Sequence, residues 1–136
     1  MDLTKEIEIA KSVRRNACAP YSKYYVGCAL KAKSGKIYSG CNIENNGIQA
    51  ICAERVAFAK ALSEGEADFN YIVVCGGYDL NKLDNCLPCG YCRQFMNEFV
   101  DKDFRIYVFS ENDKIEEFTI EDLLPHSFKL NREKGV

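Results

Sequence analysis

The segment YIVVCGG, residues 71–77, constrains the fold of this 136-residue chain more than any other stretch. Its residues are apolar at successive positions and do not alternate with polar ones. A continuous apolar run of this length is typical of a strand that is buried on both faces of its sheet. We therefore expect a sheet with other elements packed on each side, which in an α/β domain are helices.

The remaining segments alternate between helical and strand patterns. Apolar spacing and helix-stopping residues predict helices over residues 4–17, 50–64 and 88–100. Strands are expected in residues 24–44 as a pair joined by a Ser-Gly turn, in residues 104–110, and in residues 114–125 before a short helix. The predicted fold is a three-layer α/β/α sandwich with a mixed five-stranded sheet, forming a single domain over residues 1–136.

The charge pattern excludes several classes of partner. Eighteen basic and twenty acidic side chains give a net charge of −2, and no block of like charge occurs. Nothing therefore favours binding to a polynucleotide or to a membrane surface. The first residues are charged and lack the apolar core of a signal peptide, and no apolar run is long enough to span a bilayer. We expect a cytoplasmic protein.

The chain has eight cysteines, which is many for its size. In a reducing compartment, cysteines serve metal binding or catalysis more often than disulfide bonding. A free cysteine in a core behaves as a small hydrophobic residue, and we expect this buried role for Cys18, Cys28, Cys41 and Cys75. The candidates for chemistry are the other four, which are Cys52, Cys86, Cys89 and Cys92.

Three of these candidates lie at the starts of predicted helices. Cys52 opens the helix over residues 50–64, and Cys89 and Cys92 form a C-x-x-C motif that opens the next one. Helix N-termini favour the thiolate form, and both predicted helices start at the loop edge of the sheet, where ligands bind. The motif alone is also typical of a redox dithiol, of half a structural zinc site, or of an iron–sulfur site. Adding Cys86 would make a closed four-thiolate zinc site.

Two residues favour an open, catalytic zinc site over the closed one. Pro88 suits the position just before a helix, which leaves Cys86 in the preceding loop. Glu54 supplies a carboxylate two residues after Cys52 without being needed as a ligand. Three thiolates and an exchangeable water are a catalytic arrangement, because zinc lowers the pKa of its water and a carboxylate can move the proton.

These motifs resemble those of the small, all-cysteine cytidine deaminases. The resemblance rests on Cys-Ala-Glu at 52–54, on PCGYCRQ at 88–94, and on APYSKYYVGCAL, GCNIEN and LLPHSF, so it covers nearly the whole chain. It implies a cytidine deaminase-like fold, a homotetramer, and one Zn²⁺ per chain held by Cys52, Cys89 and Cys92. It also implies deamination of cytidine and deoxycytidine for pyrimidine salvage, with water added at C4 and Glu54 carrying protons to N3 and to the departing amine.

The resemblance also implies roles for residues outside the metal set. Arg55 would donate hydrogen bonds to the sulfurs and offset their negative charge. Asn42 and Glu44 would bind the ribose, and the main chain of Ala53 would contact the base. Two further roles are for aromatic residues: Tyr24 would pack on the nucleoside, where the family usually has phenylalanine, and Phe128 would close a neighbouring subunit's site. His126 is expected to be a loop residue away from the metal.

One loop departs from the family pattern. Between Asn45 and Cys52 the chain reads NGIQAI, which is one residue shorter than is typical and lacks a tyrosine. This difference leaves the zinc residues unchanged but bears on the substrate. A deaminase of a related nucleoside such as blasticidin S therefore stays as an alternative. A structural zinc protein or a nucleic-acid-binding protein is a second alternative, which the near-neutral charge disfavours.

Overall fold

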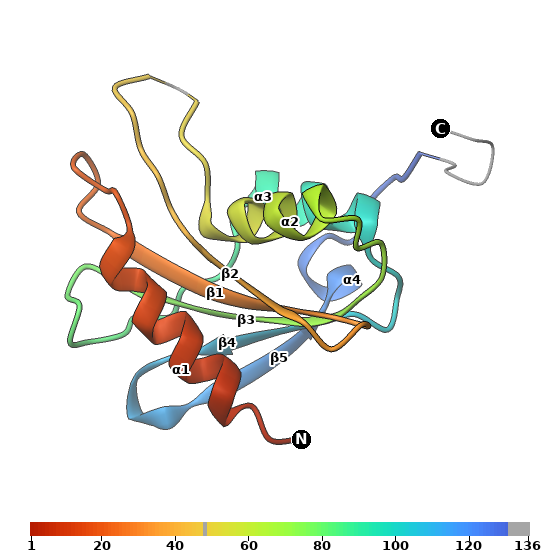
Figure 1. Ribbon diagram of the computed structural model, residues 1–136, viewed down its shortest axis with the longest axis horizontal. Helices are drawn as coiled ribbons and strands as arrows, with labels where there is room; N and C mark the ends of the chain where they lie inside the picture. The colour runs from red at the N-terminus through yellow and green to blue at the C-terminus, as the bar shows by residue number, and fades with distance from the viewer. Residues whose placement is uncertain (48, 131–136) are drawn as a thin grey trace.

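The computed structural model describes residues 1–47 and 49–130, which form three layers around a twisted sheet (Figure 1). Among these residues, five strands pair in the order β2-β1-β3-β4-β5. β1 is antiparallel to β2 and β3, β3 is parallel to β4, and β4 is antiparallel to β5. The mixed five-stranded sheet is thus confirmed, with the bounds β1 Tyr25–Ala32, β2 Ile37–Cys41, β3 Phe69–Gly77, β4 Arg105–Phe109 and β5 Ile115–Thr119.

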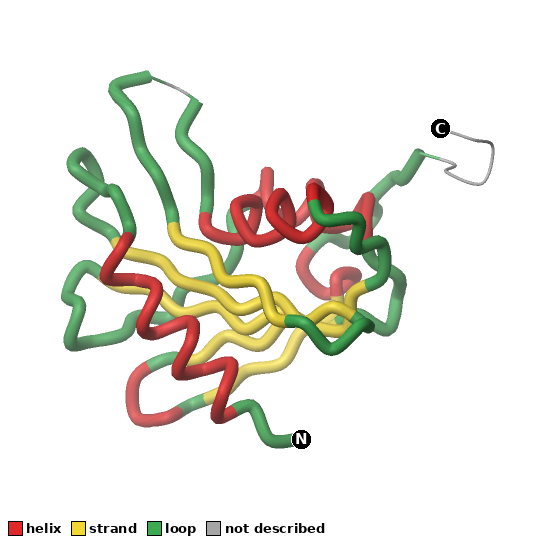
Figure 2. Tube along the Cα trace, in the orientation of Figure 1, coloured by secondary structure: helices red, strands yellow, loops and turns green. Residues whose placement is uncertain are grey.

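Helices cover both faces of the sheet, as predicted (Figures 1 and 2). α1 (Thr4–Val13) packs on β1 and β3 from one side. On the other side lie α2 (Ala53–Ser63), α3 (Gly90–Phe99) and the single turn α4 (Ile120–Leu123). No helix within the described part of the chain is both long and apolar enough to cross a membrane.

The two faces of β3 belong to two separate cores. Ile72 and Val74 pack in the larger core with residues of α2 and α3. Tyr71, Val73 and Cys75 pack in the smaller core under α1. Successive side chains of a strand point to opposite faces, so burial on both faces requires an apolar residue at every position. This arrangement explains the continuous apolar run and confirms the expectation based on it.

The ends of the helices differ from the sequence prediction by a few residues. The first helix was expected to reach residue 17, but its last turn is a 3-10 helix over Arg14–Asn16. The second begins at Ala53 and not at residue 50, because Ile51 is instead paired with Ile43 through two main-chain hydrogen bonds of 3.0 and 2.9 Å. This pairing leaves Cys52 as the N-cap of α2, and Cys89 is likewise the N-cap of α3.

The predicted burial of four cysteines is only partly right. Cys28 and Cys75 are buried and Cys41 is half-buried, but Cys18 is exposed. The expectation for Cys18 was wrong because its main chain pairs with Asn42 and Glu44 outside the sheet, at the surface. His126 is an exposed residue in the loop after α4, with a φ of 60°.

Replacing Gly40 with alanine tests how tightly α2 is held on the sheet. A Cβ at Gly40 would lie 2.3 Å from the carbonyl oxygen of Ala53 and 2.8 Å from the backbone nitrogen of Ala57. We expect Gly40→Ala to lower the free energy of unfolding by about 1–3 kcal/mol, measured by denaturant titration of the zinc-loaded protein. Gly47→Ala is the control, because the nearest atom to its Cβ is 3.7 Å away. Equal stability of both variants and the native protein would contradict this close packing.

Candidate functional site

The N-termini of α2 and α3 bring three cysteine sulfurs together. Cys52 and Cys89 are the N-cap residues of the two helices, and Cys92 lies in the first turn of α3. The three sulfur atoms lie within 4.8 Å of one another, and those of Cys52 and Cys89 are 3.7 Å apart. The sequence prediction that these segments converge is therefore correct at the level of the sulfur atoms.

The spacing of the sulfurs fits a tetrahedral zinc ion. Ligands about 2.3 Å from a tetrahedral zinc lie roughly 3.8 Å from each other. Within residues 1–47 and 49–130, no fourth cysteine, histidine or carboxylate joins the cluster. Cys92 is buried, Cys52 is half-buried and Cys89 is exposed, so the cluster opens to solvent on one side. Three ligands with an open side leave a coordination position for water, which is the arrangement of a catalytic zinc.

Cys86 lies outside this cluster. Its thiol is buried and lies near the hydroxyl group of Tyr24, close enough for each group to affect the pKa of the other. Burial, with a smaller contribution from the negative charge of Glu54, raises the pKa of the Cys86 thiol to about 12. Cys86 is therefore set apart from the zinc site by its position, because it is not among the three sulfurs that lie within 4.8 Å of one another.

A positive charge lies against the sulfurs. Nη2 of Arg55 is 3.5 Å from Sγ of Cys52, and it also donates to the carbonyl oxygen of Ala50 at 3.3 Å. Hydrogen bonding within the cluster, first from Cys92 and then from Arg55, lowers the pKa of the Cys52 thiol. The guanidinium group thus favours the thiolate that a metal needs, and offsets part of the charge of three thiolates.

Tyr91 supports Arg55 from the solvent side, a role that sequence analysis did not predict. The guanidinium carbon of Arg55 lies 4.0 Å from the centre of the Tyr91 ring, a cation–π geometry. Tyr91 is 65% exposed, so its ring is one wall between Arg55 and water. The one sequence feature that could have indicated this role is the presence of an aromatic residue inside the C-x-x-C motif, between Cys89 and Cys92.

Glu54 is a buried acid beside the sulfur cluster. It is the second residue of α2 and only 3% exposed. Burial raises the pKa of its carboxyl group to about 7, and its negative charge is close enough to raise the pKa values of Cys28, Cys86 and Cys92. A carboxyl group next to an open metal position can accept a proton and deliver it again.

Two residues predicted to bind the sugar are held in different ways. The side-chain amide of Asn42 bonds the main chain at the start of β1, accepting from the nitrogen of Val26 at 2.9 Å and donating to the carbonyl of Tyr24, just before the strand, at 2.8 Å. Glu44 accepts from the main-chain nitrogens of Tyr21 and Ser22. Glu44 also lines a cavity of about 390 Å³, together with the loop that follows it.

The remaining predicted residues lie at a helix start and on the C-terminal segment. The carbonyl oxygen of Ala53 accepts from the thiol of Cys28 at 3.3 Å, while its N–H belongs to the first turn of α2, where main-chain donors have no partner within the helix. Phe128 is 71% exposed, and its carbonyl accepts hydrogen bonds from Gln94 and Asn97 of α3. The structure thus brings Ala53 to the cluster, whereas Phe128 lies outside the cavity that contains Glu44.

Serine substitutions distinguish the three-sulfur site from a four-sulfur one. We expect Cys52→Ser, Cys89→Ser and Cys92→Ser each to lose most bound zinc, because each removes one of the converging thiolates. Cys86→Ser should keep a full complement of zinc, since Cys86 is not one of the three converging sulfurs. Zinc per chain, measured by atomic emission on dialysed protein, is the readout. Loss of zinc from the Cys86 variant would show that the site is closed by a fourth thiolate.

Comparison with known proteins places the chain in a family. A family model described as the cytidine and deoxycytidylate deaminase zinc-binding region matches residues 2–108. The cytidine deaminase of Sporosarcina psychrophila is 42% identical over 129 residues, which span 94% of this chain and 92% of that protein. The blasticidin-S deaminase of Bacillus cereus is 32% identical over 115 residues, or 81% of each chain. A crystal structure of the cytidine deaminase from Burkholderia pseudomallei matches with a TM-score of 0.85 and 36% identity, covering 94% of this chain and all of that one. The chain therefore belongs to the zinc-binding cytidine and deoxycytidylate deaminase family.

Proposed function

We propose that this protein hydrolyses cytidine and deoxycytidine to uridine and deoxyuridine with release of ammonia, using one zinc ion per chain. The observation that carries the proposal is the approach of three cysteine sulfurs to within 4.8 Å of one another beside the buried Glu54. Relatives of similar length named cytidine deaminases support the choice of substrate. The active unit is a single domain.

The chemistry divides between the metal and Glu54. Zinc would be held by Cys52, Cys89 and Cys92, and when bound would supply a Lewis acid that lowers the pKa of water. Glu54 would take a proton from the attacking water and give it to N3 of the base as the water oxygen adds to C4. Glu54 then carries the second proton to the amino group, the C4–N bond breaks, and ammonia leaves. Each proton that the water loses is thus returned to the substrate nitrogens.

Other residues orient the nucleoside. The N–H of Ala53, at the start of α2, donates to the base, and the carboxylate of Glu44 accepts from a sugar hydroxyl at the cavity that it lines. The ring of Tyr24 packs on the nucleoside, with its main chain held by the amide of Asn42. Asn42 contributes to sugar binding in two ways. It holds the main chain of Tyr24, and the second lone pair of its Oδ1 and the second hydrogen of its Nδ2 are available to bond a sugar hydroxyl.

The active form is a cytoplasmic homotetramer that serves pyrimidine salvage and does not act on polynucleotides. Two segments support assembly. The loop after β2 projects from the body of the molecule (Figure 1), and the exposed ring of Phe128 lies on a segment bonded to α3. In an assembled enzyme these segments reach a neighbouring subunit, where Phe128 closes the site over the substrate.

A second candidate substrate follows from that loop. It is one residue shorter than is typical of the family, and one of the relatives is a blasticidin-S deaminase. Deamination of such a modified cytosine nucleoside uses the same metal and proton carrier. The two candidates differ only in how the pocket encloses the sugar side of the substrate.

An ammonia-release assay across a nucleoside panel tests the proposal. The panel contains cytidine, deoxycytidine, blasticidin S, adenosine and cytosine, each with the zinc-loaded protein and with protein treated with a chelator. We expect release from cytidine and deoxycytidine that disappears on chelation. Rapid release from blasticidin S with none from cytidine would make the second candidate correct, and no release from any compound would refute deamination.

Glu54→Gln tests the proton carrier. Glutamine keeps the shape of the side chain but cannot carry a proton, so we expect turnover of cytidine to fall at least about a hundredfold while zinc stays bound. The same change at Glu64, an exposed residue at the other end of α2, should leave turnover unaltered. Near-normal deamination by the Glu54 variant would assign the proton transfers to a different group.

Lengthening the short loop tests its effect on substrate binding. The tyrosine that the family typically has falls near Ile48, which lies outside the described residues, and Gln49. We expect insertion of one tyrosine after Gly47 to lower the KM for cytidine by up to about tenfold, the worth of one hydrogen bond. Insertion of one alanine at the same place controls for length. A KM for cytidine that is unchanged or higher after the tyrosine insertion would show that the native loop does not weaken binding.

A further inference from the structure

We infer that Arg14 is a positioning residue for the nucleoside site. It bonds main-chain carbonyls next to Tyr24 and Tyr78, and the contact between these two rings holds the ring of Tyr24 in place. Arg14 lies beneath the sheet at the end of α1, on the face opposite α2 and α3. It touches neither the cysteine cluster nor the cavity of Glu44. The inference rests on the proposed function, because Tyr24 is the residue that packs on the nucleoside.

The guanidinium group of Arg14 joins two separate stretches of main chain. Nε donates to the carbonyl of Tyr25 at 2.8 Å, and Nη2 donates to those of Asp79 at 2.9 Å and Gly77 at 3.1 Å. Arg14 is only 2% exposed, and among the described residues it forms no ion pair. A buried charge is costly unless hydrogen bonds satisfy it, so these carbonyls and the guanidinium group hold one another in place.

The bonded carbonyls flank an aromatic pair. Tyr25 follows Tyr24 in the chain, and Gly77 and Asp79 lie on either side of Tyr78. The rings of Tyr24 and Tyr78 meet edge to face, with centroids 4.6 Å apart and planes at 83°. Tyr78 is 67% exposed, so little surrounding packing restrains it and its position depends on its main chain. Arg14 therefore sets the place of Tyr78, and Tyr78 restrains Tyr24.

The close packing of α1 on β1 holds Arg14 itself in position. A Cβ at Gly27 of β1 would lie 2.1 Å from the carbonyl of Ala10 and 2.9 Å from Cγ of Arg14. The helix thus rests directly on the strand, with no layer of side chains between them at this point. Because the helix cannot slide without a clash, the direction of the Arg14 side chain is determined by the packing of α1 on β1.

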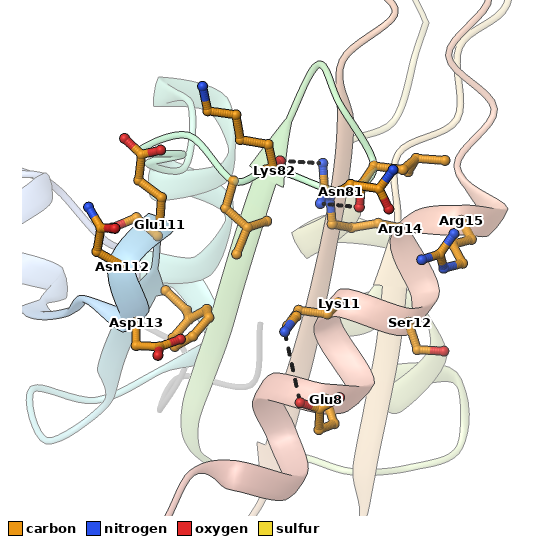
Figure 3. A pocket seen from close by; sticks show the side chains of 14 residues that line it. Glu8, Lys11, Ser12, Arg14, Arg15, Asn81, Lys82, Glu111, Asn112 and Asp113 are labelled. Atoms are coloured by element: carbon orange, nitrogen blue, oxygen red, sulfur yellow. Dashed lines mark hydrogen bonds and ion pairs between the residues drawn. The ribbon is translucent and has the colours of Figure 1, made fainter.

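Arg14 also lines a cavity of about 600 Å³, where its guanidinium group lies against the loop over residues 80–82 that lines the same cavity (Figure 3). In the same view, dashed lines join the guanidinium group to the loop over residues 80–82, where the carbonyls of Leu80 and Lys82 lie at 3.5 Å. Lys11, in the same cavity, is paired with Glu8 at 3.9 Å. The arginine is therefore committed to main-chain carbonyls and does not serve as a ligand-binding charge of this cavity.

The hydroxyl end of Tyr24 is directed toward the buried residues beside the reaction centre. It lies near the thiol of Cys86, on which the charge of Glu54 also acts. A shift of Tyr24 would change the surface on which the nucleoside packs, but it would leave Glu54 and the cysteine cluster intact. A positioning role of this kind changes KM more than kcat, since binding is altered and proton transfer is not.

The test compares Arg14→Lys, Tyr78→Leu and the double variant. Lysine keeps the charge, but its three donors lie on one nitrogen and do not reproduce the planar fork by which Nε reaches Tyr25 and Nη2 reaches Asp79. We expect each single variant to raise the KM for cytidine by roughly five- to tenfold, with kcat within about twofold and zinc unchanged. The double variant should be no worse than the worse single variant, since both changes remove one linkage. Arg15→Lys, at the exposed neighbouring residue, is the matched control.

Several results would overturn the inference. These are a native KM in Arg14→Lys or Tyr78→Leu, a loss confined to kcat, or effects that multiply in the double variant. Tyr78→Leu removes an exposed ring, so it keeps the test open if Arg14→Lys does not fold. Hydrogen exchange separates this inference from the proposed function: amides of residues 78–82 should exchange faster in Arg14→Lys than in Arg15→Lys, whatever the substrate. Equal exchange would refute the linkage, whereas a native protein inactive on cytidine would refute only the function.

Discussion

The convergence of three thiolates at two helix N-termini is the interaction on which the active site depends. Three negative sulfurs within 4.8 Å repel one another unless opposite charge compensates them. Three sources of compensation meet here. They are the metal, the positive ends of the α2 and α3 dipoles, and Arg55, whose Nη2 lies 3.5 Å from Cys52. A zinc ion held by these thiolates would lie beside the buried carboxyl group of Glu54 and, through the exposed side of the cluster at Cys89, near solvent.

The three sulfurs stay close together only if the starts of α2 and α3 keep their relative positions, and packing in the larger core fixes these positions. Phe58 of α2 is fully buried, and its ring contacts Phe69 of β3 with centroids 4.9 Å apart and Phe95 of α3 at 6.3 Å. The same helix rests on β2 at Gly40, where only a hydrogen atom fits. One aromatic residue therefore connects both helices and the sheet, so packing in the larger core controls the distance between the cysteines at the two helix starts.

The parts of the fold that could be predicted from the sequence are those in which the local pattern of apolar residues reflects burial. β3 is apolar at each position because both its faces are covered, and this pattern predicts a buried strand without knowledge of the elements that cover it. The convergence of Cys52, Cys89 and Cys92 could be predicted because the C-x-x-C and Cys-Ala-Glu segments both open helices. The helix after residue 50 was predicted too early, since its start depends on the pairing of Ile51 with Ile43, which no local pattern records.

Contacts between distant segments were beyond sequence reasoning for the same reason. Arg14 reads as a charged residue near a helix end, yet it is buried and bonded to carbonyls more than sixty residues away. Cys18 reads as one more small apolar residue, yet local pairing at the surface leaves it exposed. In the sequence Tyr91 is only a residue between two cysteines, yet in the structure its ring lies against the guanidinium group of Arg55. The role of each of these three residues depends on contacts with other segments of the folded chain, which its neighbours in the sequence do not reveal.

X-ray absorption at the zinc edge of the purified protein, without substrate, tests the central claim most directly. An open catalytic site predicts three sulfur neighbours at about 2.3 Å and one oxygen neighbour at about 2.0 Å. Addition of a nucleoside product should then change the oxygen shell and leave the sulfur shell unaltered. Four sulfur neighbours, unaffected by any nucleoside, would mean that the metal is closed off from water, and would contradict the assignment of this cluster as a reaction centre.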